Sequence, residues 1–377
     1  MNNPYTNRGT IKKIDEFYGR EREVRRIFSR ISSSHPQCLS IIGERKIGKS
    51  SLLYFIDNKE IMKQNLKNPD SYVFLLIDLQ ERNGEMSLTG FFQFIFKMIS
   101  EILGDQYVPA SAIDDARDEI KCYEIFKRIV TNTDKNGLKL ILLFDEFGTI
   151  TGSSQFEPDF FSFLRSIANN HECAYITTSR QKLQKLCRNS NVSESPFFNI
   201  FTPVPLGQFD RKEALSLIFT PSSNAGIKFF DEDAEFILSI AGHHPLFIQM
   251  ACAALFDYKA HNQERSAKVN YDEVKTSFLT EAFEQFEQIW LDEDDKEREV
   301  LSSIATGTEI NNQQQYIIRE LLRKGYIIDE PPMLFSEAFS DFVLSKNPSL
   351  ASSAKTEKQV KGRSSFSDFV NRIFRRS

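Results

Sequence analysis

The sequence predicts an α/β fold: a parallel sheet with helices on both faces, then a helical subdomain and a small C-terminal domain. Three observations predict it. Over about the first 200 residues, short apolar segments alternate with longer segments of helical periodicity. One apolar segment, LKLILLFDE (138–146), is apolar almost throughout, as expected of a strand covered on both faces. After Leu206 the strand-like segments give way to helical ones.

Each predicted strand is a short apolar run bounded by polar or turn residues. The five strands are CLSIIG (38–43), YVFLLIDLQ (72–80), LKLILLFDE (138–146), CAYITTSR (173–180) and NIFTPVPL (199–206). Helical spacing of apolar residues predicts the elements between them. These helices cover 20–31, a segment from Lys49, 87–103, the region from Asp114 to Val130, and 156–170.

The domain boundaries follow changes in composition. Residues 281–299 hold nine acidic residues against two basic ones, which indicates a solvated connector. Two helices and a two-stranded turn after it resemble a winged helix. The predicted parts are an N-terminal arm (1–16), a core (17–206), a helical lid (207–280), an acidic connector (281–296), a winged-helix domain (297–345), a flexible linker (346–363) and a basic amphipathic tail helix (364–377).

Composition excludes several classes of protein. The chain has 377 residues, 41% of them hydrophobic, so it can bury full-sized cores and is not a disordered chain. A net charge of −5 excludes a broadly basic nucleic-acid coat. No apolar run approaches the length of a membrane span, and no secretory signal is evident. Five scattered cysteines predict reduced thiols and a cytoplasmic protein.

The strongest motif is GERKIGKS (43–50), which matches the phosphate-loop pattern GxxxxGK[ST] between a predicted strand and a predicted helix. Its glycines allow backbone N–H groups to face phosphate oxygens, and the helix N-terminus adds positive charge. Lys49 is expected to reach the β- and γ-phosphates and Ser50 to ligate Mg²⁺. The full set of predicted loop contacts is Gly43, Glu44, Arg45, Lys46, Ile47, Gly48, Lys49, Ser50 and Ser51.

Two further strands end in polar residues that suit a phosphate site. Asp145 ends the strand LILLFDE, where a carboxylate can hold Mg²⁺, and Glu146 is placed to orient or deprotonate a water. Arg180 ends ITTSR and can bind a γ-phosphate through its guanidinium. No arginine from a neighbouring subunit is identifiable, because Arg165 and Arg188 fit surface positions better.

Together these segments resemble the STAND-type signalling ATPases and the related archaeal-ATPase and AAA-like families. FYGRERE (17–23) is similar to the N-terminal Gly-Arg-Glu motif of those families, and GHHPLFIQ (242–249) to their Gly-x-Pro motif. The resemblance implies that Tyr18, Gly19 and Arg20 flank adenine, and that Pro245 packs near the base. For His243 and His244, within the second motif, two alternatives stay open: a functional role in the motif, or a structural position as a helix cap or as core histidines.

The resemblance also implies a function: a P-loop NTPase that binds ATP or ADP with Mg²⁺ and turns over slowly as a conformational switch. Such switches form homo-oligomers in the ATP state. This chain departs from many members because no repeat array or effector enzyme follows the winged helix. Sensing and output are therefore expected from partners or from the tail.

The C-terminal part leaves alternatives open. The predicted recognition helix offers Arg319, Arg323 and Lys324, so a DNA-associated ATPase is an alternative function, although the nearby acidic residues favour intramolecular packing. Residues 346–377 carry a net charge of +6 and end in an amphipathic pattern, which predicts docking on a protein or on an anionic membrane surface. A non-hydrolysing adaptor that holds ADP and acts through this tail is a further alternative.

Overall fold

The computed structural model divides the chain into two compact units. It describes residues 2–80, 86–187, 193, 195–262, 268–311, 314–328 and 331–346. The sheet unit is Thr10–Leu206, and the helical unit combines Met1–Gly9 with Gly207–Ser377. The sheet unit ends at the same residue as the predicted core. The predicted arm is divided, because its first residues pack within the helical unit.

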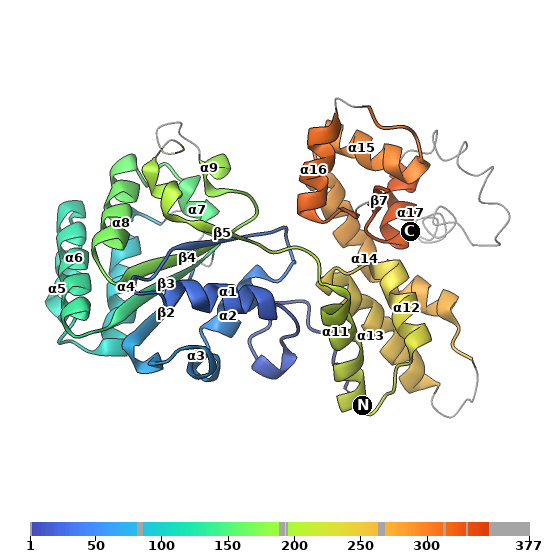
Figure 1. The fold of residues 1–377 in the computed structure, drawn as a ribbon, viewed down its shortest axis with the longest axis horizontal. Coiled ribbons are helices and arrows are strands. Elements are labelled where there is room, and N and C mark those ends of the chain that lie inside the picture. The colour runs from blue at the N-terminus through green and yellow to red at the C-terminus, as the bar shows by residue number, and fades with distance from the viewer. Residues whose placement is uncertain are drawn as a thin grey trace. The chain divides into compact units, whose positions relative to one another are not determined.

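The sheet unit contains five parallel strands. They are β1 (Leu39–Ile42), β2 (Tyr72–Asp78), β3 (Lys139–Asp145), β4 (Cys173–Ser179) and β5 (Thr202–Pro205). Their order is β2-β3-β4-β1-β5, so β1 lies between β4 and β5 (Figure 1). The carboxyl ends of the neighbouring strands β1, β3 and β4 therefore lie at one edge of the sheet.

Helices cover both faces of this sheet. The helices of the unit are α1 (Glu21–Ile31), α2 (Lys49–Ile56), α3 (Lys59–Asn65), α4 (Leu88–Leu103), α5 (Ala110–Asp115), α6 (Glu119–Lys135), α7 (Gly148–Thr151), α8 (Pro158–Asn170) and α9 (Leu183–Leu186). The connection from β1 to β2 runs across the sheet in the direction opposite to the later connections. Right-handed crossovers therefore place α2 and α3 on one face, and α4, α6 and α8 on the other (Figure 1).

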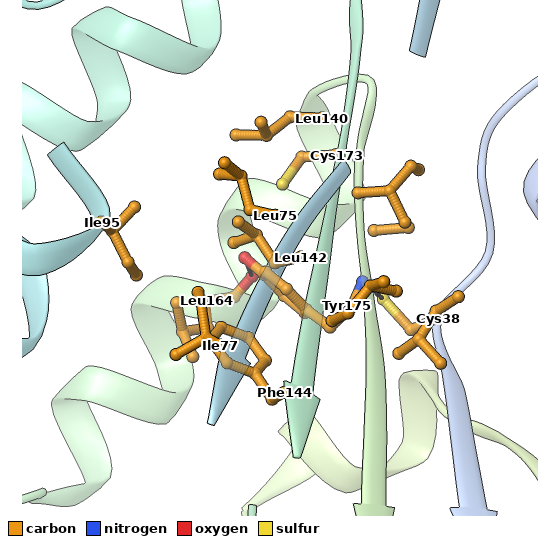
Figure 2. Packing of buried hydrophobic residues seen from close by; sticks show 14 of the residues in the cluster. Cys38, Leu75, Ile77, Ile95, Leu140, Leu142, Phe144, Leu164, Cys173 and Tyr175 are labelled. Carbon is orange, nitrogen blue, oxygen red and sulfur yellow. Dashed lines mark hydrogen bonds between the residues drawn. The ribbon is translucent and has the colours of Figure 1, made fainter. Parts of the chain in front are cut away.

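The core of the sheet unit is built around the central strand β4. Tyr175 is fully buried there, and its hydroxyl donates a hydrogen bond to the Leu164 carbonyl at 2.9 Å (Figure 2). Its backbone N–H lies 3.3 Å from the Cys38 sulfur. Burial raises the pKa of Cys38 to about 12, so this thiol stays protonated. All five cysteines are free thiols, as the sequence predicts.

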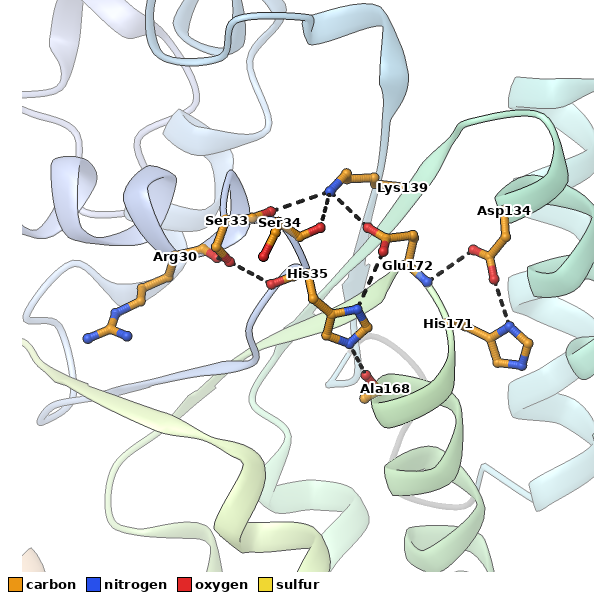
Figure 3. Close-up of polar contacts among 9 residues, drawn as sticks. All are labelled: Arg30, Ser33, Ser34, His35, Asp134, Lys139, Ala168, His171 and Glu172. Atoms are coloured by element: carbon orange, nitrogen blue, oxygen red, sulfur yellow. Dashed lines mark hydrogen bonds and ion pairs between the residues drawn. The ribbon is translucent and has the colours of Figure 1, made fainter.

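A cluster of polar residues lies at the edge of the sheet where the parallel strands begin (Figure 3). Lys139 Nζ, at the start of β3, lies 2.8 Å from Glu172 Oε2 in the loop before β4. The His35 ring lies 3.4 Å from the other oxygen of Glu172, and His171 lies 2.7 Å from Asp134. These pairs tie the loops before β1 and β4 to the start of β3 and to α6, and we therefore assign them a structural role.

The helical unit begins after Leu206. Its helices are α11 (Arg211–Asn224), α12 (Asp231–Ala241), α13 (Pro245–His261), α14 (Tyr271–Asp292), α15 (Asp295–Thr306), α16 (Gln315–Lys324) and α17 (Glu337–Lys346). Two short antiparallel strands, β6 (Ile327–Ile328) and β7 (Met333–Leu334), form a hairpin between α16 and α17. Among the described residues, no helix combines the length and apolarity that a membrane span requires. The predicted tail helix, most of the linker and Arg188 lie outside the described residues.

Helix α14 differs from the predicted acidic connector. It runs through the predicted boundary at residue 280 without interruption. Phe278, Ala282 and Phe286 repeat every four residues and are buried, which places one face of the helix in the core of the unit. The acidic residues within α14 occupy the remaining faces, so this part of the charge lies on the exposed side of a packed helix, whereas Glu293, just after α14, is buried.

The N-terminal residues are anchored in the helical unit by Tyr5. Its ring is buried, and its hydroxyl accepts a hydrogen bond from the Ser222 N–H at 3.0 Å and donates one to the Ile218 carbonyl. These are the two groups that an unbroken helix would join directly, four residues apart. The hydroxyl therefore bridges them within α11, beside Pro221 inside the same helix.

A buried ion cluster joins α14, α15 and α16. Lys324 Nζ lies 2.6 Å from a Glu293 oxygen and 2.7 Å from a Glu297 oxygen. Burial, the larger cause, raises the pKa of Glu293 to about 8, and Glu297 adds to the shift. Two carboxylates share one ammonium here, so Glu293 takes up a proton near neutral pH.

This cluster predicts a pH-dependent stability. Native Glu293 holds a proton that the unfolded chain loses near its ordinary pKa of 4.5, so stability should fall as pH rises from about 5 to about 8. The slope should not exceed about 1.4 kcal/mol per pH unit for one proton. Thermal unfolding of Glu293→Gln should lack this decline, whereas Glu299→Gln, at an exposed carboxylate of α15, should keep it. Equal pH profiles for wild type and Glu293→Gln would contradict the assignment.

Candidate functional site

The loop between β1 and α2 forms a turn that depends on two glycines. A Cβ on Gly43 would lie 2.5 Å from the Leu206 carbonyl oxygen, so a larger residue cannot fit without moving the backbone. Gly48 has φ +102, a conformation that side chains disfavour, and caps the start of α2. Lys46, between them, also has a positive φ, of 64. The chain thus turns tightly into the N-terminus of α2.

Lys49, the first residue of α2, is a buried cation at this turn. Its side chain is 5% exposed, and its ammonium donates to the Glu44 carbonyl at 3.2 Å. A Glu146 oxygen lies 3.7 Å from the same nitrogen. Burial lowers the pKa of Lys49, and the nearby carboxylates of Glu146 and Asp145 oppose that shift. A buried ammonium beside a helix N-terminus suits an anionic group such as phosphate.

The carboxylates at the end of β3 are held by the neighbouring strand. Asp145 is buried, and one of its oxygens accepts a hydrogen bond from the Thr178 hydroxyl. The same hydroxyl accepts the Glu146 N–H at 2.8 Å. Glu146 has φ +53, so the chain turns sharply just after the strand. The two predicted acids and Lys49 therefore lie at one edge of the sheet.

Arg180, Ser50 and Ser51 complete the predicted loop surroundings. Arg180 follows Ser179, whose carbonyl accepts the Gly43 N–H at 3.1 Å, and its positive charge contributes to lowering the pKa of Lys49. Ser50 is partly buried in the first turn of α2. The Ser51 hydroxyl accepts the Ile11 N–H at 3.0 Å. In this arrangement Ser51 therefore holds the preceding chain segment.

The Gly-Arg-Glu motif contacts the phosphate loop directly. Arg20 is 4% exposed, and its guanidinium donates to the Ile47 carbonyl at 3.1 Å. Both Gly19 and Arg20 have positive φ, and Arg20 caps α1. Tyr18 is partly buried, and that burial raises its pKa. Arg20 thus stabilises the phosphate loop through its hydrogen bond to the Ile47 carbonyl, a contact that the motif alone does not predict.

The Gly-His-His-Pro segment lies in the helical unit, and it is engaged within that unit. The His243 ring lies 3.0 Å from the Phe209 carbonyl oxygen. His244 is buried, with its ring 4.9 Å from that of Phe247. Both histidines therefore have structural positions. Pro245 is the first residue of α13, and its predicted packing near a base stays a prediction.

Sequence reasoning missed two features of the edge. Thr178 holds both acids, and the only available signal was a pair of threonines ending a buried strand. Asp78 ends β2 and is the register partner of Asp145. In the part of the chain that the structure describes, no three His, Cys, Asp or Glu side chains gather closely enough to hold a metal alone. The donor set fits Mg²⁺ bound together with phosphate oxygens, because one carboxylate and one hydroxyl are typical of that arrangement.

A family model agrees with this geometry. The model described as Novel STAND NTPase 2 matches residues 33–310, which is most of the chain. The chain belongs to this family. As a Novel STAND NTPase 2 member, it is a P-loop NTPase of the STAND type, and the predicted family is confirmed. No sequence match to a curated protein was found.

Solved structures share the fold of this STAND NTPase. The Walker-type ATPase PABY2304 of Pyrococcus abyssi matches with a TM-score of 0.59 and 14% identity, over 90% of this chain and 99% of that one. The ORC2 protein of Aeropyrum pernix, in ADPNP–ADP complexes, matches with a TM-score of 0.55 and 14% identity, over 94% and 98% of the chains. At these identities the similarity shows the fold alone. It confirms the predicted P-loop NTPase class, while the winged helix stays a prediction.

Proposed function

We propose that this STAND NTPase is a Mg²⁺-dependent ATPase whose nucleotide state controls its conformation and its partners. The observation that carries the proposal is the buried Lys49 ammonium, held between the Glu44 carbonyl and the Glu146 carboxylate at the start of α2. A buried cation is stabilised by neighbouring negative charge, and the phosphate groups of a nucleotide bound at the loop would provide that charge.

Different groups of the site would bind the phosphates and the Mg²⁺ of the nucleotide. Backbone N–H groups of the loop after Gly43 and the N-terminus of α2 would face phosphate oxygens, while the Gly43 N–H itself donates to the Ser179 carbonyl at 3.1 Å. Lys49 would neutralise the terminal phosphates. Ser50 and Asp145 would hold Mg²⁺, and the Thr178 hydroxyl already orients one oxygen of Asp145. The preference for adenine rests on the family resemblance of the motif at Tyr18, Gly19 and Arg20.

Glu146 is the residue that would act on water. Bound Mg²⁺·ATP supplies the γ-phosphoryl group whose transfer to water is the reaction. A phosphate at Lys49 would compete with Glu146 for the ammonium, which leaves the carboxylate able to accept a proton from water. Arg180, beside Lys49, would stabilise charge on the γ-phosphate.

The switch itself rests on the family resemblance. Nucleotide in the loop would favour a closed arrangement of the helical parts and a homo-oligomer. Release or hydrolysis would reverse both. Residues 364–377 would then engage a protein partner or an anionic membrane surface through their basic, amphipathic sequence.

The first test replaces the proposed base. Glu146→Gln should release phosphate at least about 100-fold more slowly, because a general base contributes 10²- to 10⁴-fold. ATP binding should persist, since Lys49 and the loop are unchanged. Light scattering after size exclusion, with ADP, with ATP and without nucleotide, should show an ATP-dependent oligomer that Glu146→Gln retains longer.

Glu157→Gln is the matched control, because Glu157 is exposed at the start of α8 in the same unit. It should behave as wild type in both assays. Phosphate release by Glu146→Gln at the rate of Glu157→Gln would exclude Glu146 as the base. If wild type stays monomeric, holds ADP and releases no phosphate, an ADP-holding adaptor replaces the ATPase proposal.

The structure gives little support to DNA binding by α16. Lys324 is directed to Glu293 and Glu297 and is 9% exposed, and Arg323 pairs with Glu320 at 3.0 Å. Two of the three basic residues proposed for phosphate contacts are therefore already neutralised. Strong phosphate binding generally requires cations available at the surface.

A further inference from the structure

Thr178 of β4 is hydrogen-bonded to the residues at the end of β3 and just after it. Its hydroxyl donates to an Asp145 oxygen and accepts the Glu146 N–H at 2.8 Å. Its carbonyl oxygen accepts the Phe147 N–H at 3.0 Å. One residue thus binds three consecutive residues of the neighbouring segment. Thr178 is itself fully buried, so no water competes for these bonds.

The segment that Thr178 holds is strained. Among the described residues other than glycine, positive φ occurs at Arg20, Lys46 and Glu146, and each of them belongs to the candidate site. A residue with a Cβ disfavours this conformation and keeps it only where surrounding contacts impose it. For Glu146, the hydrogen bond from its N–H to Thr178 is such a contact.

We propose that Thr178 is a positioning residue that sets Asp145 for Mg²⁺ and Glu146 for water through a single shared hydroxyl. The inference rests on the proposed function and adds a residue to it. The hydroxyl satisfies one lone pair of Asp145 and fixes its carboxylate plane. The same hydroxyl also fixes the backbone conformation at Glu146, which sets the direction of the Glu146 side chain. Both acids therefore depend on one shared hydroxyl.

The chain offers a matched control one residue away. Thr177 is also fully buried in β4, and among the described residues its hydroxyl bonds to the Leu39 carbonyl, at 3.5 Å. Valine has nearly the shape of threonine without the hydroxyl. Thr178→Val and Thr177→Val therefore remove the same atom from adjacent buried positions, and Thr178→Ser restores the hydroxyl.

The test combines three readouts on the full chain. Amide hydrogen exchange without nucleotide should become about 10- to 100-fold faster at Glu146 in Thr178→Val, because its N–H loses its acceptor. The ratio of ATP affinities with Mg²⁺ and with EDTA should fall about 10-fold or more, as should turnover. Affinity for ATP in EDTA should stay within about threefold of wild type, since the loop is intact.

Thr178→Ser and Thr177→Val should resemble wild type in all three readouts. The inference is overturned if Thr178→Val matches Thr177→Val in exchange and in the Mg²⁺ dependence of ATP affinity. It is also overturned if ATP affinity in EDTA falls as far as affinity in Mg²⁺, because that indicates a general structural defect. Absence of phosphate release from wild type would remove the ATPase proposal, and exchange and Mg²⁺ dependence would still judge Thr178.

Discussion

Replacing Lys49 with methionine is expected to weaken ATP binding about 1,000-fold, which corresponds to about 4 kcal/mol. The ammonium lies in a buried position with 5% of the side chain exposed, so its attraction for phosphate is poorly screened. Loss of one partner of a buried, hydrogen-bonded charge pair typically costs about 2–5 kcal/mol. A titration with fluorescent ATP analogue, or calorimetry, measures the change.

The folded structure should tolerate this substitution. Methionine has a similar length, and a buried cation costs desolvation energy that methionine does not require. Loss of the ammonium also removes a cation beside Glu146 and the buried Asp145, which opposes this gain, so we expect the unfolding temperature of Lys49→Met to stay close to that of wild type. Lys63→Met removes an exposed ammonium from α3 in the same unit and should change neither property. ATP affinity within about threefold of wild type would show that Lys49 does not bind phosphate.

The pKa of Lys49 adds a second signature. Burial lowers that pKa below its usual value of 10.5, so the amine loses its proton at a lower pH than an exposed lysine. ATP affinity of wild type should therefore decline as pH rises towards this lowered pKa. Lys49→Met has no proton to lose at this position, so its weak binding should lack that decline.

Local features of the site were predictable from the sequence. The turn at 43–50 depends on glycines close together in the chain, and the motif begins directly after an apolar strand. Asp145 could be placed at the edge of the sheet because the run before it is apolar almost throughout. Each inference required only neighbouring residues and the known geometry of parallel strands.

Contacts between distant segments were not predictable in the same way. The Thr178 hydroxyl reaches Asp145 because β3 and β4 pair in one register, which a single sequence does not specify. Arg20 reaches the Ile47 carbonyl through the packing of α1. In α14, the acidic residues outnumber the buried apolar ones. The composition of this segment therefore predicted a solvated connector, whereas the structure shows a helix with one face packed in the core.

Gly242 shows how such a distant contact determines stability. Gly242→Ala is expected to destabilise the helical unit by about 4 kcal/mol or more, through backbone strain and overpacking together. Its φ of +62 and ψ of −152 lie in a region essentially reserved for glycine. An added Cβ would lie 2.2 Å from the Phe335 carbonyl oxygen, so the strain cannot be relieved by a small shift of Gly242 alone.

Phe335 cannot move away cheaply. Its N–H donates to the Tyr326 carbonyl at 3.1 Å, which ties it to the start of the hairpin. Its buried ring stacks at 5.6 Å on Phe247 and at 4.8 Å on Phe339. Relief of the clash would therefore separate the β6–β7 hairpin and α17 from α12 and α13, which removes aromatic packing throughout this part of the unit.

Gly307→Ala is a control that separates the cost of backbone strain from the cost of steric overlap. Gly307 also has a positive φ, of 75, at the end of α15, but nothing lies within 4 Å of its added Cβ. This variant should lose only about 1–2 kcal/mol, the cost of a left-handed residue. Hydrogen exchange resolved by segment should show faster opening of the helical unit in Gly242→Ala and unchanged protection of β1, β3 and β4. A loss no greater than that of Gly307→Ala would mean that the contact with Phe335 is not rigid. Retained stability with weakened ATP binding would instead assign the glycine of this motif to the nucleotide.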